Sequence, residues 1–120
     1  MKRAQPERQL QAAVAQYLKA ALPADAFFSA LPGGDGRMTR APGYRAGLPD
    51  LMVFWNTGAA DPRLVFFELK SKVGRLSREQ LECHNAMRIA DAFVYTVKSI
   101  AEVESWLRYC GIPLRAAVAA

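Results

Sequence analysis

The chain has 120 residues, which is enough for one compact domain and too few for a second independent hydrophobic core. Hydrophobic residues make up 52% of it and charged residues 22%, which argues against wholesale disorder. Sixteen lysines and arginines against eleven acidic residues give a formal net charge of +5, and this balance favours an anionic partner such as nucleic acid.

The cysteines and the N-terminal residues bear on where the protein works. Cys83 and Cys110 lie far apart and lack the Cys/His spacing of a zinc site, so neither a zinc site nor a disulfide framework is expected. No apolar segment typical of a signal peptide follows the N-terminus, and no apolar stretch approaches the length of a membrane span. We therefore expect reduced thiols, a cytoplasmic location and no membrane partner.

The first predicted elements are a helix over residues 6–22 and a short strand over residues 27–31. Apolar residues recur at steps of three and four along the helix, Pro6 suits its first turn, and Pro23 ends it. The strand leads into a long loop without any carboxylate between Asp35 and Asp50, and long loops in small domains are typically functional or mobile. The residues of interest in this loop are Gly33, Gly34, Arg37, Arg40 and Arg45.

Two β-rich runs, residues 50–55 and 64–70, flank a turn cluster and predict an antiparallel hairpin at the centre of the sheet. A capping box at Ser77 opens a helix to about residue 90, residues 92–97 form a further strand, and a second cap at Ser99 starts the last helix. The order is α-β-β-β-α-β-α in a single α/β domain (an α+β mixed sheet) over residues 1–120. The tail after about residue 113 is expected to be loosely held.

Alternation along residues 64–70 places the side chains of Glu68 and Lys70 on one face of the second hairpin strand. Such a pair can share one site, in which the carboxylate holds a hard cation and the lysine lies near its bound water. The alternative is an exposed ion pair at the frayed end of a strand. Asp50 opens the neighbouring strand and could bring a second carboxylate to the same cation, although a residue that merely starts a strand after proline fits the same position.

Three motifs follow one another along the chain: Gly47-Leu48-Pro49-Asp50, then Phe67-Glu68-Leu69-Lys70, then Gly74-Arg75-Leu76-Ser77-Arg78-Glu79-Gln80. In this order and at these distances they resemble the VRR-NUC family of PD-(D/E)XK nucleases, and in particular its compact stand-alone members from phages and prophages. The resemblance covers residues 7–107. It implies a restriction-endonuclease-like core, which agrees with the element order, and a bacterial or phage-infected cell as the setting.

The resemblance also implies roles for individual residues. Asp50 and Glu68 would bind Mg²⁺ or Mn²⁺ together with the carbonyl of Leu69, and Lys70 would orient or activate the attacking water. Gln80 matches the family's glutamine, but it also stands at the third position of the helix that Ser77 caps, so it serves the site, the capping box or both. Glu7 matches the carboxylate of the family's first helix, a place that Gln9 would take if the register slipped by two residues.

Basic residues flank the proposed site on two sides. Either these residues grip phosphates, with help from the amides of Gly33 and Gly34, or they form a solvated cationic surface. The single histidine, His84, is expected to pack or cap and is given no part in the mechanism. The basic residues of the two flanks, apart from Lys70, are Arg37, Arg40, Arg45, Lys72, Arg75 and Arg78.

The resemblance therefore predicts a metal-dependent DNA endonuclease, a phosphodiesterase that leaves a 5′-phosphate. The compact members resemble enzymes that resolve four-way (Holliday) junctions as homodimers, because two symmetric cuts need two active sites related by a two-fold axis. Branched DNA and a second copy of the chain are thus the expected partners. Two other functions stay open: a non-catalytic nucleic-acid-binding module on the same fold, and a small protein-interaction subunit.

Overall fold

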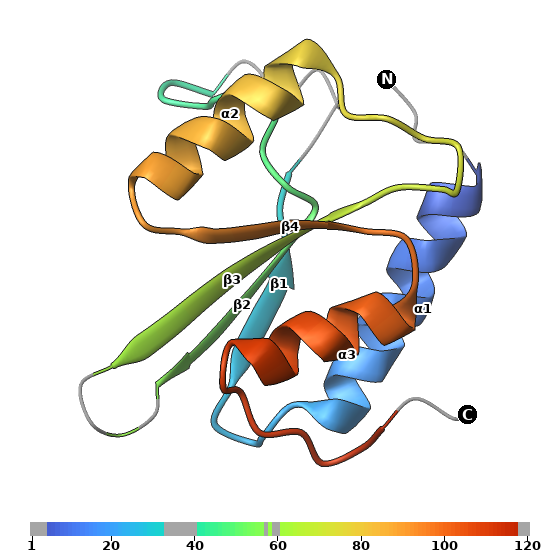
Figure 1. Ribbon diagram of the computed structural model, residues 1–120, viewed down its shortest axis with the longest axis vertical. Helices are drawn as coiled ribbons and strands as arrows, with labels where there is room; N and C mark the ends of the chain where they lie inside the picture. The colour runs from blue at the N-terminus through green and yellow to red at the C-terminus, as the bar shows by residue number, and fades with distance from the viewer. Residues whose placement is uncertain (1–4, 33–40, 57, 59–60, 118–120) are drawn as a thin grey trace.

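The computed structural model describes residues 5–32, 41–56, 58 and 61–117. The described residues form three helices and four strands in the predicted order α-β-β-β-α-β-α (Figure 1). The elements are α1 (Gln5–Ala21), β1 (Phe27–Ala30), β2 (Leu51–Asn56), β3 (Pro62–Leu69), α2 (Arg78–Ile89), β4 (Phe93–Val97) and α3 (Ile100–Tyr109).

The four strands form one mixed sheet in the order β1-β2-β3-β4. The β1–β2 and β2–β3 pairs are antiparallel, and β4 lies parallel to β3 after the crossover through α2. The predicted hairpin of β2 and β3 is confirmed as the centre of the sheet, with Leu51 opposite Phe67. Central strands have neighbours on both sides, so a residue at the end of β3 is held by the ladder of the whole sheet.

Helices cover both faces of the sheet: α1 and α3 lie side by side on one face, and α2 lies on the other (Figure 1). Tyr17 of α1 donates a hydrogen bond to Glu104 of α3, which ties the two helices of the first face together. Alternate residues of β3 point into this layer, as the period of two predicts. The buried cluster there consists of Val14, Leu18, Leu22, Leu51, Val53, Val65, Phe67, Leu69, Val97, Val103, Leu107, Cys110 and Ile112.

The predicted helix starts are confirmed by their caps. The Ser77 hydroxyl accepts from the Gln80 amide, and the Gln80 side chain accepts from the Ser77 amide, which completes the capping box. Ser99 caps α3 by accepting from the amide of Glu102. The carboxylate of Glu102 accepts from the amide of Lys98, one residue before the cap, so the second signal is a cap of related but different geometry.

Two smaller features complete the fold. The described part of the C-terminal tail contacts the body of the protein, because the Arg115 amide donates to the carbonyl of Ala21 and Leu114 packs against the core. Among the described helices, none combines the length and the apolar character that crossing a membrane requires.

Candidate active site

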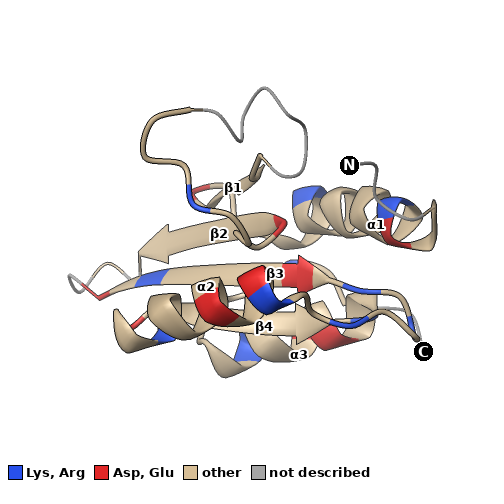
Figure 2. Cartoon of the chain, turned by 90° about the horizontal axis from the view of Figure 1, so that it is seen from above, with Lys and Arg blue, Asp and Glu red and all other residues tan. Residues whose placement is uncertain are grey.

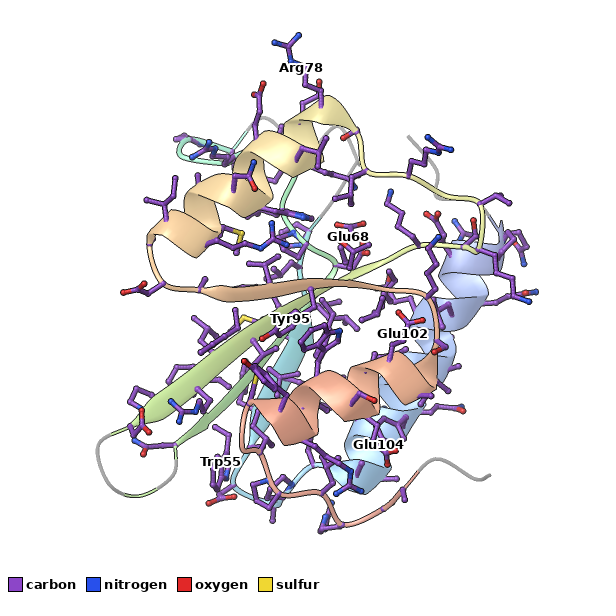
Figure 3. The ribbon with its side chains drawn as sticks, in the orientation of Figure 1. Trp55, Glu68, Arg78, Tyr95, Glu102 and Glu104 are labelled. Carbon is purple, nitrogen blue, oxygen red and sulfur yellow. The ribbon has the colours of Figure 1, made fainter. Side chains whose placement is uncertain are left out.

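The site forms around Glu68, which lies at the end of β3 on the face covered by α2 (Figure 3). Its side chain is fully buried, so the alternative of an exposed ion pair at a frayed strand end is wrong. Three side chains surround the carboxylate. Gln80 donates to Oε2 at 3.2 Å, Lys70 Nζ lies 3.8 Å from the same oxygen, and His84 Nε2 lies 3.6 Å from Oε1.

Lys70 is also buried, with 11% of its side chain exposed, and it lies on the same side of the chain as Glu68. The parallel pairing with β4 continues to this residue, because its amide donates to the carbonyl of Val97. Burying a lysine side chain costs free energy unless it is paired, and here the partner is Glu68. Since the lysine stem is held by the sheet, its amine is directed at the site instead of sampling solvent.

Asp50 reaches the site through a break in the β2–β3 ladder. Leu51 already lies opposite Phe67, and the amide of Asp50 donates to the carbonyl of that same residue at 2.9 Å. Two successive residues thus oppose one, which is the local geometry of a β-bulge and re-aims a side chain. Asp50 Oδ2 accepts from the Leu69 amide at 2.7 Å, so its carboxylate lies beside the Glu68–Leu69 peptide.

This geometry corrects one detail of the expected hairpin. Asp50 precedes β2 instead of opening it, and it contacts the backbone of the residue after Glu68. The resemblance implied the Asp50 carboxylate and the Leu69 carbonyl as metal ligands. These two groups therefore come from chain segments that lie next to each other in space. The backbone of Asp50 is fixed on its other side too, since the Leu31 amide donates to the Asp50 carbonyl.

The side chain of Gln80 joins α2 to β3. Its Oε1 accepts from the Ser77 amide while its Nε2 donates to Glu68 Oε2. One end of the amide thus completes the helix cap, and the other end contacts the Glu68 carboxylate. The cap fixes the orientation of the amide, and so fixes which of its atoms faces Glu68.

The segment before Asp50 docks on the first turn of α2. Gly47 has φ of +92°, and a Cβ at this position would overlap the backbone carbonyl of Glu79 and lie 2.9 Å from the amide nitrogen of Gln80. Only glycine permits both this φ and this approach. Gly47, three residues before Asp50, is therefore packed against the helix that carries Gln80.

Glu7 lies on the other side of the end of β3. Its Oε2 accepts from the Ser71 amide at 3.2 Å, and Gly74 packs so closely on it that a Cβ there would lie 2.6 Å from the same oxygen. Gln9 is exposed. Of the two candidates on the first helix, Glu7 is thus the one directed at the chain that follows Lys70, where its carboxylate accepts from the Ser71 amide.

The donor set fits a small, hard cation that takes few protein ligands. No group of three or more His, Cys, Asp or Glu side chains with metal-binding geometry occurs among the described residues. Magnesium is typically held by one or two carboxylates, with water and substrate phosphates in the other positions. Within the described part of the chain, the fully buried Glu68 Oε1 has no hydrogen-bond partner, which leaves its lone pairs available to a cation.

The predicted DNA-contacting residues differ in how they are placed. Gly33, Gly34, Arg37 and Arg40 lie outside the described residues. The segment that leaves β3 carries basic residues (Figure 2), and Lys72 and Arg75 in it are exposed. Arg78 projects away from Glu68 (Figure 3) and forms an exposed ion pair with Glu82 at 3.1 Å.

Arg45, in the segment docked on α2, is exposed and lies near the Cys83 thiol. Burial raises the pKa of Cys83, and the positive charge of Arg45 opposes that rise. Arg45 therefore lies beside α2.

Sequence reasoning missed two residues that contact this region. His84 was expected to pack, and it is fully buried as expected, but it packs against the Glu68 carboxylate. Its position one helical turn after Gln80 was the available signal, because residues four apart share a helix face. Lys98 Nζ donates to the carbonyl of Lys72 at 2.8 Å and adds a cation to the segment after β3, a contact between distant stretches that no local pattern reveals.

Comparisons with known proteins bear on the fold. No protein-family model matches the chain, and no curated protein matches it. A solved structure described as a "VRR_NUC domain" matches with a TM-score of 0.62 and 23% sequence identity, covering 88% of this chain and 98% of the matched one. The mixed sheet, the three helices and their order agree with that match over nearly all of both chains. The chain therefore has the fold of a VRR_NUC domain.

Proposed function

We propose that the protein is a metal-dependent DNA endonuclease of the VRR-NUC family. The observation that supports this most directly is the buried Glu68 carboxylate, held by Gln80 and Lys70 and flanked by Asp50 at the Leu69 amide. Burying a carboxylate costs free energy unless it is paired or binds a cation. Glu68, beside a second carboxylate and a buried lysine, therefore costs stability, and this cost supports a role of the group in catalysis.

In the proposed mechanism, Asp50, Glu68 and the carbonyl of Leu69 would hold Mg²⁺ or Mn²⁺. When bound, such an ion polarises a phosphoryl oxygen and stabilises the charge that develops on it. Lys70 would position the attacking water and place its side-chain amine close to the charge that develops on the phosphoryl group. Gln80 keeps the Glu68 carboxylate in one orientation, and Glu7 steadies the amide of Ser71, the residue after Lys70.

The substrate that we propose is DNA, including branched DNA. The net charge of +5, the exposed Lys72 and Arg75, and Arg45 beside α2 are suited to phosphate contacts. The assignment of four-way junctions and of a homodimer rests on likeness to compact VRR-NUC domains and on the symmetry of paired cuts.

Labelled four-way junction, flap and duplex DNA, each with Mg²⁺, Mn²⁺ or a chelator, test the proposal. We expect cleavage only with metal, and a loss of at least about 100-fold in Glu68→Gln and Lys70→Met. Glu79→Gln makes the same acid-to-amide change at an exposed residue of α2 and should cleave like the wild type. A mass measurement in solution tests the homodimer.

Each failure of this experiment has a distinct meaning. Cleavage that survives chelation, or that survives both Glu68→Gln and Lys70→Met, contradicts the mechanism. Salt-dependent DNA binding with no cleavage at any metal concentration indicates the non-catalytic module. Absence of DNA binding at low salt indicates a protein-interaction subunit.

A further inference from the structure

The side chain of His84 is a polar group that is buried beside the site. It is fully buried, and within the described part of the chain neither ring nitrogen has a hydrogen-bond partner. Glu68 Oε1 is in the same condition, and it lies 3.6 Å from His84 Nε2. Leaving a buried donor and a buried acceptor unpaired side by side costs free energy that one hydrogen bond would recover.

The distance between the two atoms is slightly too long for a hydrogen bond, and a movement of roughly half an ångström would form one. The two groups approach from different layers, His84 from α2 and Glu68 from β3, so a small rigid shift of the helix changes this distance. Gln80 lies four residues before His84 on the same face of α2 and already donates to the other oxygen of Glu68. One face of α2 therefore presents donors to both oxygens of the carboxylate.

We propose that His84 is a positioning residue for Glu68: it donates Nε2–H to Oε1 and, with Gln80, fixes the plane of the carboxylate for metal binding. Each carboxylate oxygen has two lone pairs, so Oε1 accepts from His84 and still binds a cation. Hydrogen bonds to metal-binding carboxylates typically carry a large part of the metal affinity, since they hold the ligand in its binding geometry. The inference rests on the proposed metal site. It adds His84, a residue outside the three motifs, to Gln80 as a second residue that holds the Glu68 carboxylate.

Metal binding separates a positioning role from a merely structural one. Titration of Mn²⁺ into the folded protein, followed calorimetrically without DNA, should show binding weakened about 10- to 100-fold in His84→Met. His84→Gln retains a nitrogen donor and should bind Mn²⁺ more tightly than His84→Met. Asn85→Met, an exposed position on the same helix, is the matched control and should bind like the wild type.

Denaturant unfolding completes this arm of the test. His84→Met removes the proposed hydrogen bond to Glu68 Oε1, but it also removes the buried Nδ1, which has no partner among the described residues, so the stability of this variant without metal should stay close to that of the wild type. Reduced stability together with wild-type Mn²⁺ affinity would show a structural role and overturn the proposal.

Nitrogen-15 NMR tests the hydrogen bond directly and independently of metal, because His84 is the single histidine of the chain. We expect a proton on Nε2 and a shift of the ring resonances in Glu68→Gln. A ring whose only proton lies on Nδ1, or one that does not respond to Glu68→Gln, would overturn the inference. If the wild type binds no Mn²⁺, the proposed function fails, and the NMR result still decides whether His84 holds Glu68.

Discussion

Gly47 lies with its α-carbon against the backbone carbonyl of Glu79, at a separation that leaves no room for a side chain. This contact joins the segment before β2 to the first turn of α2. It joins the chain segments that carry two residues of the site, Asp50 and Gln80, which are 30 positions apart in the sequence. The geometry of the site thus depends on a backbone contact as well as on its charged side chains.

The first prediction concerns Gly47→Ala. The added methyl group meets the α2 backbone, and the positive φ strains any residue other than glycine, so the free energy of unfolding should fall by clearly more than about 1 kcal/mol. Urea unfolding measures the loss. Cleavage should fall as well, because a shift of the segment at Gly47 would also move Asp50, three residues further along the chain.

Gly43→Ala is the control for this prediction. Gly43 has a similar φ of +83°, but nothing lies within 4 Å of its Cβ position, so this variant carries the strain without the clash. It should lose only about 1 kcal/mol and keep its activity. Equal losses in the two variants would show that the packing of Gly47 on α2 contributes nothing.

The predictability of the fold follows from how local its determinants are. The caps at Ser77 and Ser99, the apolar periods and the turn between β2 and β3 act over a few residues, so the sequence predicts every element to within one or two residues. The side of β3 that carries Glu68 also follows from alternation alone. These features need no knowledge of the partner elements.

The parts that escaped prediction depend on contacts between layers. The slip of register at Asp50, the approach of Gly47 to Glu79 and the approach of His84 to Glu68 each join segments that no periodic pattern relates. A buried histidine has the same pattern in a sequence whether it faces an apolar core or a carboxylate. The role of such a histidine depends on which residue of the sheet it faces, and for His84 that residue is Glu68.

The second prediction separates the two roles of Gln80. Ser77→Ala removes the cap and should cost about 1 kcal/mol of stability while cleavage stays close to the wild type. Gln80→Glu keeps an oxygen that accepts from the Ser77 amide but replaces the donor to Glu68 by a second carboxylate. We expect this variant to retain the helix, measured by circular dichroism, and to lose most of its cleavage.

A different result for Gln80→Glu would change the assignment. Wild-type cleavage in this variant would reduce Gln80 to a helix cap. Loss of stability equal to that of Gln80→Ala would show that the glutamate does not preserve the capping box, and Ser77→Ala then remains the measure of the cap alone.

The third prediction concerns the salt dependence of DNA binding, measured by fluorescence anisotropy in a chelator so that no cleavage occurs. Arg75 is exposed and makes no ion pair with any residue that the structure describes. If it contacts a phosphate, Arg75→Ala should lower the slope of log affinity against log salt by about 0.9 on duplex DNA. Arg78→Ala should lower it less, because Arg78 is already paired with Glu82.

An equal change in the two arginine variants would contradict this distinction. The Glu82→Gln variant provides a further check, because releasing Arg78 from its ion pair should strengthen DNA binding and steepen the slope. A solvated cationic surface without phosphate contacts predicts the same slope in all of these variants.

The fourth prediction uses the contact between α1 and α3. Burial, together with the nearby charge of Glu104, raises the pKa of Tyr17 from 10.0 to about 12. The folded protein therefore retains this proton more strongly than the unfolded chain, so the stabilisation is complete below pH 10 and is lost as the pH rises through about 12. Tyr17→Phe removes the group from the titration and should make the free energy of unfolding fall less steeply over this range.

Urea unfolding at a reference pH below 10 and at several values up to about 12 measures the effect. Some slope should remain in Tyr17→Phe, since burial also raises the pKa of Tyr95. Tyr109→Phe is the control, because that side chain is 75% exposed, and it should follow the wild type throughout. Identical slopes of the free energy of unfolding against pH in Tyr17→Phe and the wild type would show that the α1–α3 contact does not hold the phenol in its neutral form. The hydrogen bond from Tyr17 to Glu104 would then open before the phenol ionises.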